Sequence, residues 1–175
     1  MIMSVKKPDS KILIMGLENS GKTSIILSLK RDVNLLSYFS LKPTKGYSIE
    51  EVKDLDKIFH IWDFGGQAQY RVEHLKNMKN YIDATKKLIY VVDVQDKKKY
   101  DASIEYLSEI LKILKDENLI PDVSVFLHKY DPNLEFEEKD LNEIINKIKK
   151  TVPTDFSYTL FKTTIFTVFR KDLLP

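Results

Sequence analysis

Residues 16–23 carry the sequence Gly-Leu-Glu-Asn-Ser-Gly-Lys-Thr, which satisfies the pattern G-x-x-x-x-G-K-[ST]. This octet follows a short apolar run at residues 11–15 and precedes a helical stretch that extends to about residue 31. A glycine-bounded turn between a strand and a helix aims backbone N–H groups at an anion. We therefore expect a phosphate-binding loop, in which Lys22 neutralises phosphate charge and the Thr23 hydroxyl ligates magnesium. The alternative is a strand–helix turn that binds nothing.

Glycine is scarce in this chain, with five glycines in 175 residues, against about twelve at average composition. A chain so poor in glycine is expected to place each one where a Cβ atom is not tolerated. Gly16 and Gly21 frame the octet, Gly46 lies in a later loop, and Gly65 and Gly66 follow an apolar strand. The glycines therefore outline a candidate site.

The overall composition is that of a single soluble domain. Apolar residues make up 43% of the chain and charged residues 31%, so we expect residues 1–175 to form one domain with an ordinary core. The net charge of +2 is far from the clustered basic excess of a nucleic-acid binder. The absence of cysteine excludes disulfides, thiolate metal ligands and lipid attachment through cysteine. The longest apolar run, residues 88–92, is too short to span a membrane, and no leader is visible, so we expect a cytoplasmic protein.

Strand-like and helix-like segments alternate along the chain. Residues 47–55 and 57–63 predict a hairpin, because two β-rich runs flank a short polar turn. The other strands are separated by helices, which favours parallel pairing in an open α/β sheet covered on both faces. Ligands of such sheets bind beyond the carboxyl ends of the strands. The remaining expected strands are residues 11–15, 87–94, 123–127 and 158–161, and the later helices are residues 69–83, 101–118 and 137–150, with a short terminal helix after them.

A second candidate segment, Trp-Asp-Phe-Gly-Gly-Gln at residues 62–67, ends the second strand of the hairpin. Asp63 would lie opposite the phosphate-binding loop, where its carboxylate can hold magnesium through a water molecule. Gly66 can offer its N–H to a terminal phosphate, and Gln67 can orient an attacking water. Taken alone, the segment is equally a strand-ending Asp with a tight turn, but its place after the octet favours function.

The third candidate segment is His-Lys-Tyr-Asp at residues 128–131, after the expected strand at residues 123–127. The Asp131 carboxylate can accept two hydrogen bonds from the N1 and N2 edge of guanine, a donor pattern that adenine lacks. The aliphatic stem of Lys129 can cover the face of the base. A charged strand exit without a ligand is the alternative, and the position of the segment favours guanine.

On these residues the chain resembles the small GTPases of the Ras superfamily, and within them most closely the Arf and Rag branches. Residues 16–23, 43–48 and 62–67 look Arf-like, whereas the histidine that begins the guanine motif, within residues 126–131, looks Rag-like. The resemblance covers nearly all of the chain. It implies a P-loop NTPase G domain, with a six-stranded, mostly parallel sheet that has one antiparallel edge strand and helices on both faces.

The resemblance also implies two switch loops, around residues 43–47 and 65–83, which the third phosphate of GTP orders. Thr44 becomes the switch I threonine, a magnesium ligand, and residues 161–165 become the loop that meets the guanine oxygen, although Thr163-Thr164 otherwise fits a helix cap. The implied protein binds GTP or GDP with Mg²⁺ and hydrolyses GTP slowly. The implied catalytic residues are Gln67, Lys22 and Thr44; the metal ligands are Thr23, Thr44 and Asp63; the nucleotide-binding residues are Glu18, Asn19, Ser20, Gly21, Lys22, Thr23, Ser24, Gly66, His128, Lys129, Asp131, Thr163 and Thr164.

Several residues depart from the superfamily pattern. His128 stands where most members have an Asn that braces the phosphate-binding loop, and we expect the imidazole ring to supply that brace. Glu18 stands where Ras has glycine and Arf proteins have an acidic residue, so it adds negative charge near the third phosphate. The three arginines, Arg31, Arg71 and Arg170, lack the context of a finger supplied in cis, and we expect Arg71 to be an exposed switch residue.

Partners follow only in outline from the sequence. We expect a GTPase-activating protein, an exchange factor and effectors, while the oligomeric state stays open. Position 2 is Ile rather than the Gly that myristoylation needs, so no direct lipid anchor is expected. Rag proteins pair through a further C-terminal domain, whereas the given sequence stops soon after Thr164. A minimal domain and a truncated sequence are the two alternatives.

Two other functions stay open from the sequence: a P-loop ATPase or nucleotide kinase, and an interaction module that holds a nucleotide without hydrolysing it. Competition between ATP and GTP would separate the first from a guanine-specific switch, because the Asp131 assignment fails if ATP binds as well as GTP. Retained Gln67 and Thr44 argue against the second.

Overall fold

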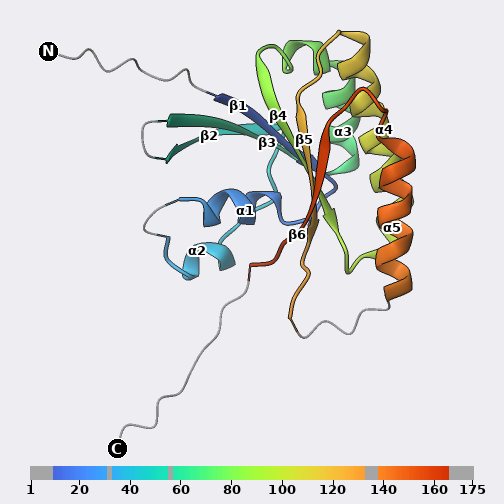
Figure 1. The fold of residues 1–175 in the computed structure, drawn as a ribbon. Helices are drawn as coiled ribbons and strands as arrows, with labels where there is room; N and C mark the ends of the chain where they lie inside the picture. Colours follow the sequence, from blue (N-terminus) through green and yellow to red (C-terminus); the bar gives the residue numbers. More distant parts are fainter. Residues whose placement is uncertain (1–9, 31–32, 55–56, 133–137, 166–175) are drawn as a thin grey trace, which may run out of the picture.

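The computed structural model describes residues 10–30, 33–54, 57–132 and 138–165. These residues form a six-stranded sheet with helices on both faces (Figure 1). The strands are β1 (Ser10–Gly16), β2 (Tyr47–Asp54), β3 (Lys57–Phe64), β4 (Thr85–Asp93), β5 (Asp122–His128) and β6 (Tyr158–Lys162). The helices are α1 (Lys22–Ser28), α2 (Leu36–Phe39), α3 (Ala68–Lys76), α4 (Tyr100–Asp116) and α5 (Glu138–Thr151), with short 3-10 turns η1 (Met78–Asn80) and η2 (Lys97–Lys99).

The strand order is β2-β3-β1-β4-β5-β6. β2 pairs antiparallel with β3, and the other neighbouring strands pair in parallel, which confirms the mostly parallel sheet with one antiparallel edge strand. In the register, Ile14 of β1 pairs with Asp63 of β3, and Gly16 pairs with Val91 of β4. The carboxyl ends of the central strands therefore meet at one edge, where ligands of open α/β sheets bind.

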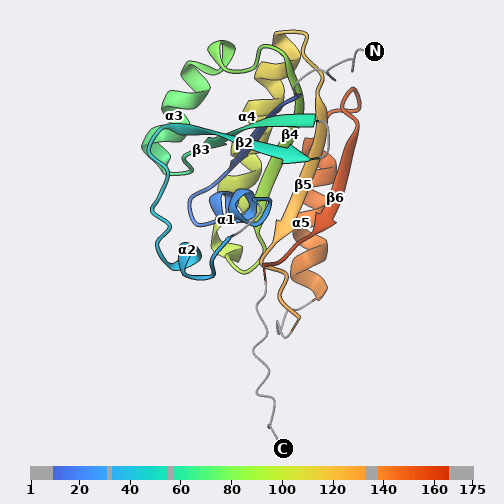
Figure 2. The ribbon, with the colours of Figure 1, turned by 90° about the vertical axis from the view of Figure 1, so that its left-hand side faces the viewer.

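Two apolar layers hold the helices to the sheet, and alternation along β1 produces both. Leu13 and Met15 belong to the larger core, which packs the sheet against α4 and α5. Ile12 and Ile14 belong to the smaller core, which includes the apolar face of α1. Figures 1 and 2 show α1 on one face of the sheet and α3, α4 and α5 on the other. Because successive side chains of a strand point to opposite faces, one central strand supports both layers.

The helical elements differ in detail from the sequence expectation. The helix expected at residues 69–83 ends at Lys76, and a 3-10 turn at Met78–Asn80 follows it. At the end of the helix, the Asn77 side chain and the Asn77 backbone N–H both donate to the Glu73 carbonyl oxygen at 3.0 Å. The expected terminal helix falls mainly in residues 166–175, outside the described residues. Among the described helices, none combines the length and apolarity that crossing a bilayer requires.

Candidate nucleotide-binding site

The loop between β1 and α1 contains two glycines with positive φ. Gly16 has a φ of 148°, and a Cβ atom there would lie 2.3 Å from the carbonyl oxygen of Val91. Gly21 has a φ of 91°, and its Cβ atom would lie 2.4 Å from the His128 ring. Both the backbone conformation and the surrounding space therefore require glycine at these positions.

The Lys22 side chain folds back into the loop and is 6% exposed. Its ammonium donates to the carbonyl oxygens of Gly16 at 3.1 Å and Leu17 at 2.7 Å, and to the Ser20 hydroxyl at 3.4 Å. Burial lowers the pKa of Lys22 to about 8, although the negative charges of Asp63 and Glu18 act in the opposite direction. The loop thus fixes a cation beside the open space that it encloses.

Three oxygen atoms from different segments converge next to this cation. The Thr23 hydroxyl, in the first turn of α1, donates to Asp63 Oδ2 at 2.6 Å, across from the end of β3. The Thr44 hydroxyl, from the loop before β2, donates to the same carboxylate oxygen at 3.0 Å and lies 3.1 Å from the Thr23 hydroxyl. Residues far apart in the sequence, and expected together as metal ligands, lie in one group.

The chemistry of this group fits a hard divalent cation. Hydroxyl and carboxylate oxygens are the ligands that Mg²⁺ prefers. Asp63 is 1% exposed, and its second oxygen, Oδ1, is buried without a hydrogen-bond partner among the described residues. Burial raises the pKa of the Asp63 carboxyl, although the hydrogen bond from Thr23 and the positive charge of Lys22 each act to lower it. A cation at this point would compensate a desolvated carboxylate that the protein itself satisfies only in part.

The turn after β3 packs directly on the phosphate-binding loop. The Glu18 N–H donates to the Gly66 carbonyl oxygen at 3.0 Å, and a Cβ atom on Gly66 would lie 2.3 Å from both the Glu18 nitrogen and the Leu17 carbonyl carbon. The Gly65 N–H donates to the Gly46 carbonyl oxygen at 2.7 Å. The two expected switch segments therefore contact each other and the loop through backbone atoms.

Arg71 corrects one expectation from the sequence. The expectation of an exposed switch residue is wrong, because Arg71 is half-buried on α3 and its Nε donates to the Gly66 carbonyl oxygen at 3.1 Å. Its guanidinium lies 5.4 Å from the centre of the Tyr106 ring, over its face. Periodicity places residue 71 on a polar helix, and only the packing of α3 against α4 turns it inward. Gln67, the residue before α3, lines the same cavity as Lys22.

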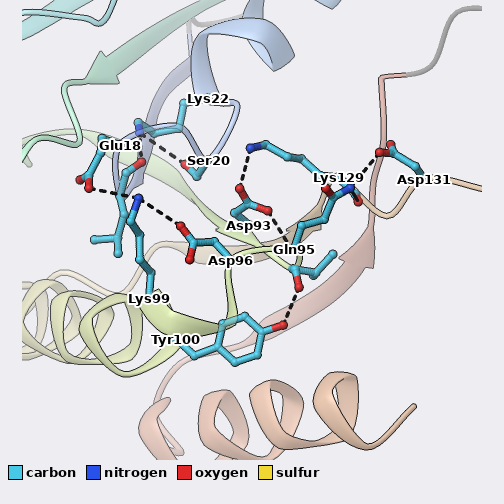
Figure 3. Close-up of polar contacts among 12 residues, drawn as sticks. Glu18, Ser20, Lys22, Asp93, Gln95, Asp96, Lys99, Tyr100, Lys129 and Asp131 are labelled. Atoms are coloured by element: carbon cyan, nitrogen blue, oxygen red, sulfur yellow. Dashed lines mark hydrogen bonds and ion pairs between the residues drawn. The ribbon is translucent and has the colours of Figure 1, made fainter. Parts of the chain in front are cut away.

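The guanine motif lies at the other end of the site, after β5. The Asp131 carboxylate accepts hydrogen bonds from the Thr164 hydroxyl and from the Gln95 side-chain amide, the latter at 2.9 Å. The Gln95 amide also donates to the Lys129 carbonyl oxygen at 2.9 Å, and the Lys129 ammonium lies 2.5 Å from Asp93 Oδ2 (Figure 3). Sequence analysis missed Asp93, the last residue of β4, and Gln95, which lies two residues after it, although both are at the ligand-binding edge of the sheet.

His128 lies between the phosphate-binding loop and the guanine motif. It is 3% exposed, and its ring occupies the space into which a Gly21 side chain would project. Its Nδ1 is 2.9 Å from the Thr163 hydroxyl, within hydrogen-bond distance. Burial, and then the charge of Lys129, lowers the pKa of the His128 imidazole, which favours the neutral ring. The contact with Gly21 is that of a brace.

Two adjoining cavities run along this edge of the sheet. One of about 690 Å³ contains most of the expected phosphate and metal residues, and one of about 370 Å³ contains His128, Lys129 and Asp131. Four expected site residues do not line these two cavities but lie within hydrogen-bond distance of residues that do: Asp63, Ser20, Thr163 and Thr164. The residues that line both cavities are Gly21, Ser24 and Lys129. Sequence analysis missed Leu35, Tyr38 and Phe39, which line the smaller cavity together with Ile165 of the expected loop at residues 161–165.

A family model described as the ADP-ribosylation factor family matches residues 1–169. The chain belongs to the ADP-ribosylation factor family. It is 34% identical over 128 residues to ADP-ribosylation factor-like protein 3 of Chlamydomonas reinhardtii, which covers 72% of this chain and 66% of the relative. It is 31% identical over 143 residues to ADP-ribosylation factor-like protein alp41 of Schizosaccharomyces pombe, which covers 81% of this chain and 71% of the relative.

A solved structure of similar fold is that of the Arl6 BBS3 small GTPase from Trypanosoma brucei, with the nucleotide analogue GppNp bound. The TM-score is 0.71 at 23% identity, over 90% of this chain and 87% of that chain, a likeness that concerns the fold. Members of the ADP-ribosylation factor family are small GTPases, and this chain is a GTP-binding switch protein of the Arf branch that hydrolyses GTP. The likeness to the Rag branch stays a prediction from residues 126–131.

An aromatic cluster joins the two switch segments in this Arf-family chain. Tyr47, at the start of β2, stacks on Trp62 of β3 with ring centres 5.1 Å apart, and Tyr81 lies 5.2 Å from Tyr47. Beneath them, the His74 ring of α3 stands edge-on to Phe64 at 4.9 Å. Movement of either switch segment must therefore rearrange packed rings in the other.

Stability of the Arf-family fold should fall below pH 6.5 because of His74, which is 1% exposed. Burial lowers the pKa of the His74 imidazole from 6.5, against the opposing influence of the Gly46 backbone. Between the lowered pKa and about 6.5, the unfolded chain binds more protons than the folded chain, so the free energy of unfolding rises with pH there. The slope contributed by one such group is at most about 1.4 kcal/mol per pH unit.

Urea unfolding between pH 5 and 8 measures this effect. His74→Phe should show a shallower pH dependence than the natural chain, because phenylalanine does not titrate at this buried position beside Phe64. An identical slope in the His74→Phe variant would contradict the assignment.

Proposed function

We propose that residues 1–175 act as a single G domain that binds GTP or GDP with magnesium and alternates between two arrangements of residues 43–47 and 65–83. The observation that carries the proposal is the convergence of Thr23, Thr44 and Asp63 within 3.1 Å of one another. Thr44 comes from the loop before β2, and its hydroxyl reaches both the first turn of α1 and the Asp63 carboxylate. A metal ion bound to the terminal phosphates would hold the hydroxyl at this position.

The residues of the larger cavity support separate roles in the hydrolysis of GTP. Lys22 would hold the negative charge of the β- and γ-phosphates, and Gly66 would approach the γ-phosphate because it carries no side chain. Gln67 would orient the water that attacks the γ-phosphate. Bound magnesium, held by Thr23, Thr44 and Asp63, would supply neutralisation of the charge that develops on the phosphate oxygens.

The residues of the smaller cavity support guanine as the base. Asp131 retains acceptor capacity beyond the bonds from Gln95 and Thr164, because a carboxylate can accept about four hydrogen bonds. Leu35, Tyr38 and Phe39 provide apolar surface opposite the motif, which suits a planar heterocycle. His128 and Thr163 would keep the base end and the phosphate end in register.

Regulation by partners is part of the proposal. Arg71 is engaged with the Gly66 carbonyl oxygen and lies over Tyr106, so it does not reach across the phosphates as a catalytic arginine would. Since no arginine of the described residues takes that position, we expect intrinsic turnover of about 10⁻² s⁻¹ or below. GTPase-activating proteins, exchange factors and effectors are the partner classes that such a slow switch requires.

Identification of the nucleotide that copurifies with the protein tests the proposal directly. Mass spectrometry of nucleotide released by denaturation should detect GDP or GTP, and a 100-fold excess of ATP should not displace fluorescent GDP. Equal displacement by ATP and GTP would overturn the guanine assignment, and ATP or ADP in the extract would do the same.

Removal of magnesium should speed the release of bound nucleotide. With EDTA in excess, the dissociation rate of fluorescent GDP should rise at least about fivefold, because the phosphate charge then loses its counterion. Thr23→Ala should already release GDP quickly with magnesium present and respond little to EDTA. A rate that EDTA leaves unchanged in the natural chain would count against the metal group.

Gln67→Leu should bind GTP with unchanged affinity and hydrolyse it at least about tenfold more slowly, because leucine cannot orient water. Single-turnover hydrolysis of radiolabelled GTP measures the rate. Gln69→Leu makes the same chemical change two positions along, at an exposed site of α3, and should hydrolyse GTP normally. Equal rates for Gln67→Leu and the natural chain would refute the role of Gln67.

A further inference from the structure

Glu18 creates an electrostatic problem inside the proposed phosphate site. It lines the larger cavity together with Lys22, Gly66 and Gln67, and its backbone N–H contacts the Gly66 carbonyl oxygen. Its side-chain oxygen Oε2 is buried and has no hydrogen-bond partner among the described residues. A carboxylate at this point repels a polyphosphate, and it repels the triphosphate more strongly because the third phosphate lies nearest to Gly66.

The Lys99 side chain, from outside the loop, reaches this carboxylate. The Lys99 ammonium, at the end of η2, lies 3.3 Å from Glu18 Oε1 and 3.1 Å from Asp96 Oδ2 (Figure 3). Figure 3 shows Glu18 turned toward Lys99, on the side of the loop that faces η2 and α4, while Lys22 lies within the loop. The Lys99 ammonium therefore lies between two carboxylates, those of Glu18 and Asp96, and the contact with Asp96 helps to fix its position.

The charge state of Glu18 agrees with this geometry. Desolvation alone would raise the pKa of the Glu18 carboxyl, but the hydrogen bond from its own backbone and the contacts with Lys99 more than offset that, so its pKa is lowered. The carboxylate is therefore ionised at neutral pH, and Arg71 adds a second positive charge on the same side. Because Glu18 is not protonated at neutral pH, its repulsion of the phosphates must be reduced by a nearby positive charge.

We propose that Lys99 is a positioning residue that determines the preference between GTP and GDP, because it holds the Glu18 carboxylate away from the third phosphate and neutralises its charge. The inference rests on the proposed function, since it concerns the same nucleotide site. Lys99 acts through Glu18 and does not itself line the cavity that contains Lys22. Without Lys99, the ionised Glu18 carboxylate is free to rotate toward the position of the γ-phosphate and repel it. GDP has no γ-phosphate, so its binding is affected less.

A double-mutant cycle tests this inference. Affinities for GDP and for a non-hydrolysable GTP analogue are measured with magnesium for the natural chain, Lys99→Ala, Glu18→Gln, and the double variant. Lys99→Ala should lower the ratio of GTP to GDP affinity by roughly fivefold to tenfold. In the Glu18→Gln background, the same change should alter the ratio by less than about twofold, and Lys99→Arg should preserve it.

Lys98→Ala is the matched control, because it removes the same charge from an exposed neighbouring position and should leave the ratio unchanged. An equal drop in both Glu18 backgrounds would show that Lys99 acts through its own charge on the nucleotide, and would overturn the inference. An unchanged ratio in Lys99→Ala would also overturn it. Failure of the natural chain to bind either guanine nucleotide would instead refute the proposed function.

Discussion

Lys22→Ala should lower the affinity for both GTP and GDP by roughly 1,000-fold, which corresponds to about 4 kcal/mol. Loss of one partner of a buried, hydrogen-bonded charge pair costs about 2–5 kcal/mol, and Lys22 is 6% exposed with three fixed acceptors. The ammonium is already in place beside the cavity, so little ordering of the side chain is needed when phosphate binds. Alanine removes that preorganised charge and leaves the carbonyl oxygens of Gly16 and Leu17 facing the nucleotide.

Fluorescence titration with labelled GDP measures the loss, and thermal unfolding in the presence of excess GDP gives an independent reading. Lys30→Ala removes the same charge from an exposed position just after α1, where the ammonium pairs with Glu50 at 2.7 Å, and should retain normal affinity. Binding by Lys22→Ala within tenfold of the natural chain would mean that the loop does not hold the phosphates.

Gly66→Ala should weaken GTP binding by about 100-fold and GDP binding by less than about threefold. The added methyl group would lie 2.3 Å from the backbone nitrogen of Glu18 and 2.5 Å from the carbonyl oxygen of Leu17, and backbone atoms cannot move aside as a flexible side chain can. In this structure the turn after β3 packs on the loop, with Thr44 beside Thr23. We expect the GTP-bound arrangement to need this packing, and the GDP-bound arrangement, which needs no γ-phosphate contact from Gly66, to tolerate the change.

Paired titrations with GDP and a non-hydrolysable GTP analogue separate the two effects. Gly46→Ala is a useful comparison, because Gly46 has a φ of 62° but a Cβ atom there meets nothing within 4 Å. Gly46→Ala therefore introduces backbone strain without a steric clash, and it should reduce GTP affinity less than Gly66→Ala does. Equal losses for GTP and GDP in Gly66→Ala would show that the contact does not depend on the nucleotide state.

Local pattern predicts the phosphate-binding loop well, because its chemistry is fixed by adjacent residues: a strand, two glycines, a lysine and a hydroxyl. Alternation of strands and helices predicts parallel pairing, and residues 47–63 predict an antiparallel hairpin; both strand directions are confirmed. The strand order was not predicted from the sequence. The joining of Thr44 with Thr23 and Asp63 was expected from resemblance, because no local pattern links residues in three separate segments.

Tertiary contacts explain what the sequence did not predict. Arg71 has the pattern of an exposed helical residue, and its burial depends on how α3 docks on α4, where Tyr106 lies. Gln95 carries no motif signal, and its importance comes from the distance between the ends of β4 and β5, where its amide reaches Asp131. The apolar lining by Leu35 and Tyr38 depends likewise on where the chain between α1 and β2 folds back.

The stacked rings of the switch region have a spectroscopic consequence. The chain contains one tryptophan, and Trp62 lies with Tyr47 on one side and with the Lys11 ammonium 4.1 Å from its ring centre. Indole emission responds to nearby charges and to stacked rings, so light emitted after selective excitation of tryptophan originates at the junction of the two switches. The molecule therefore carries its own optical reporter, and stopped-flow recording can follow each change of state in real time without a dye.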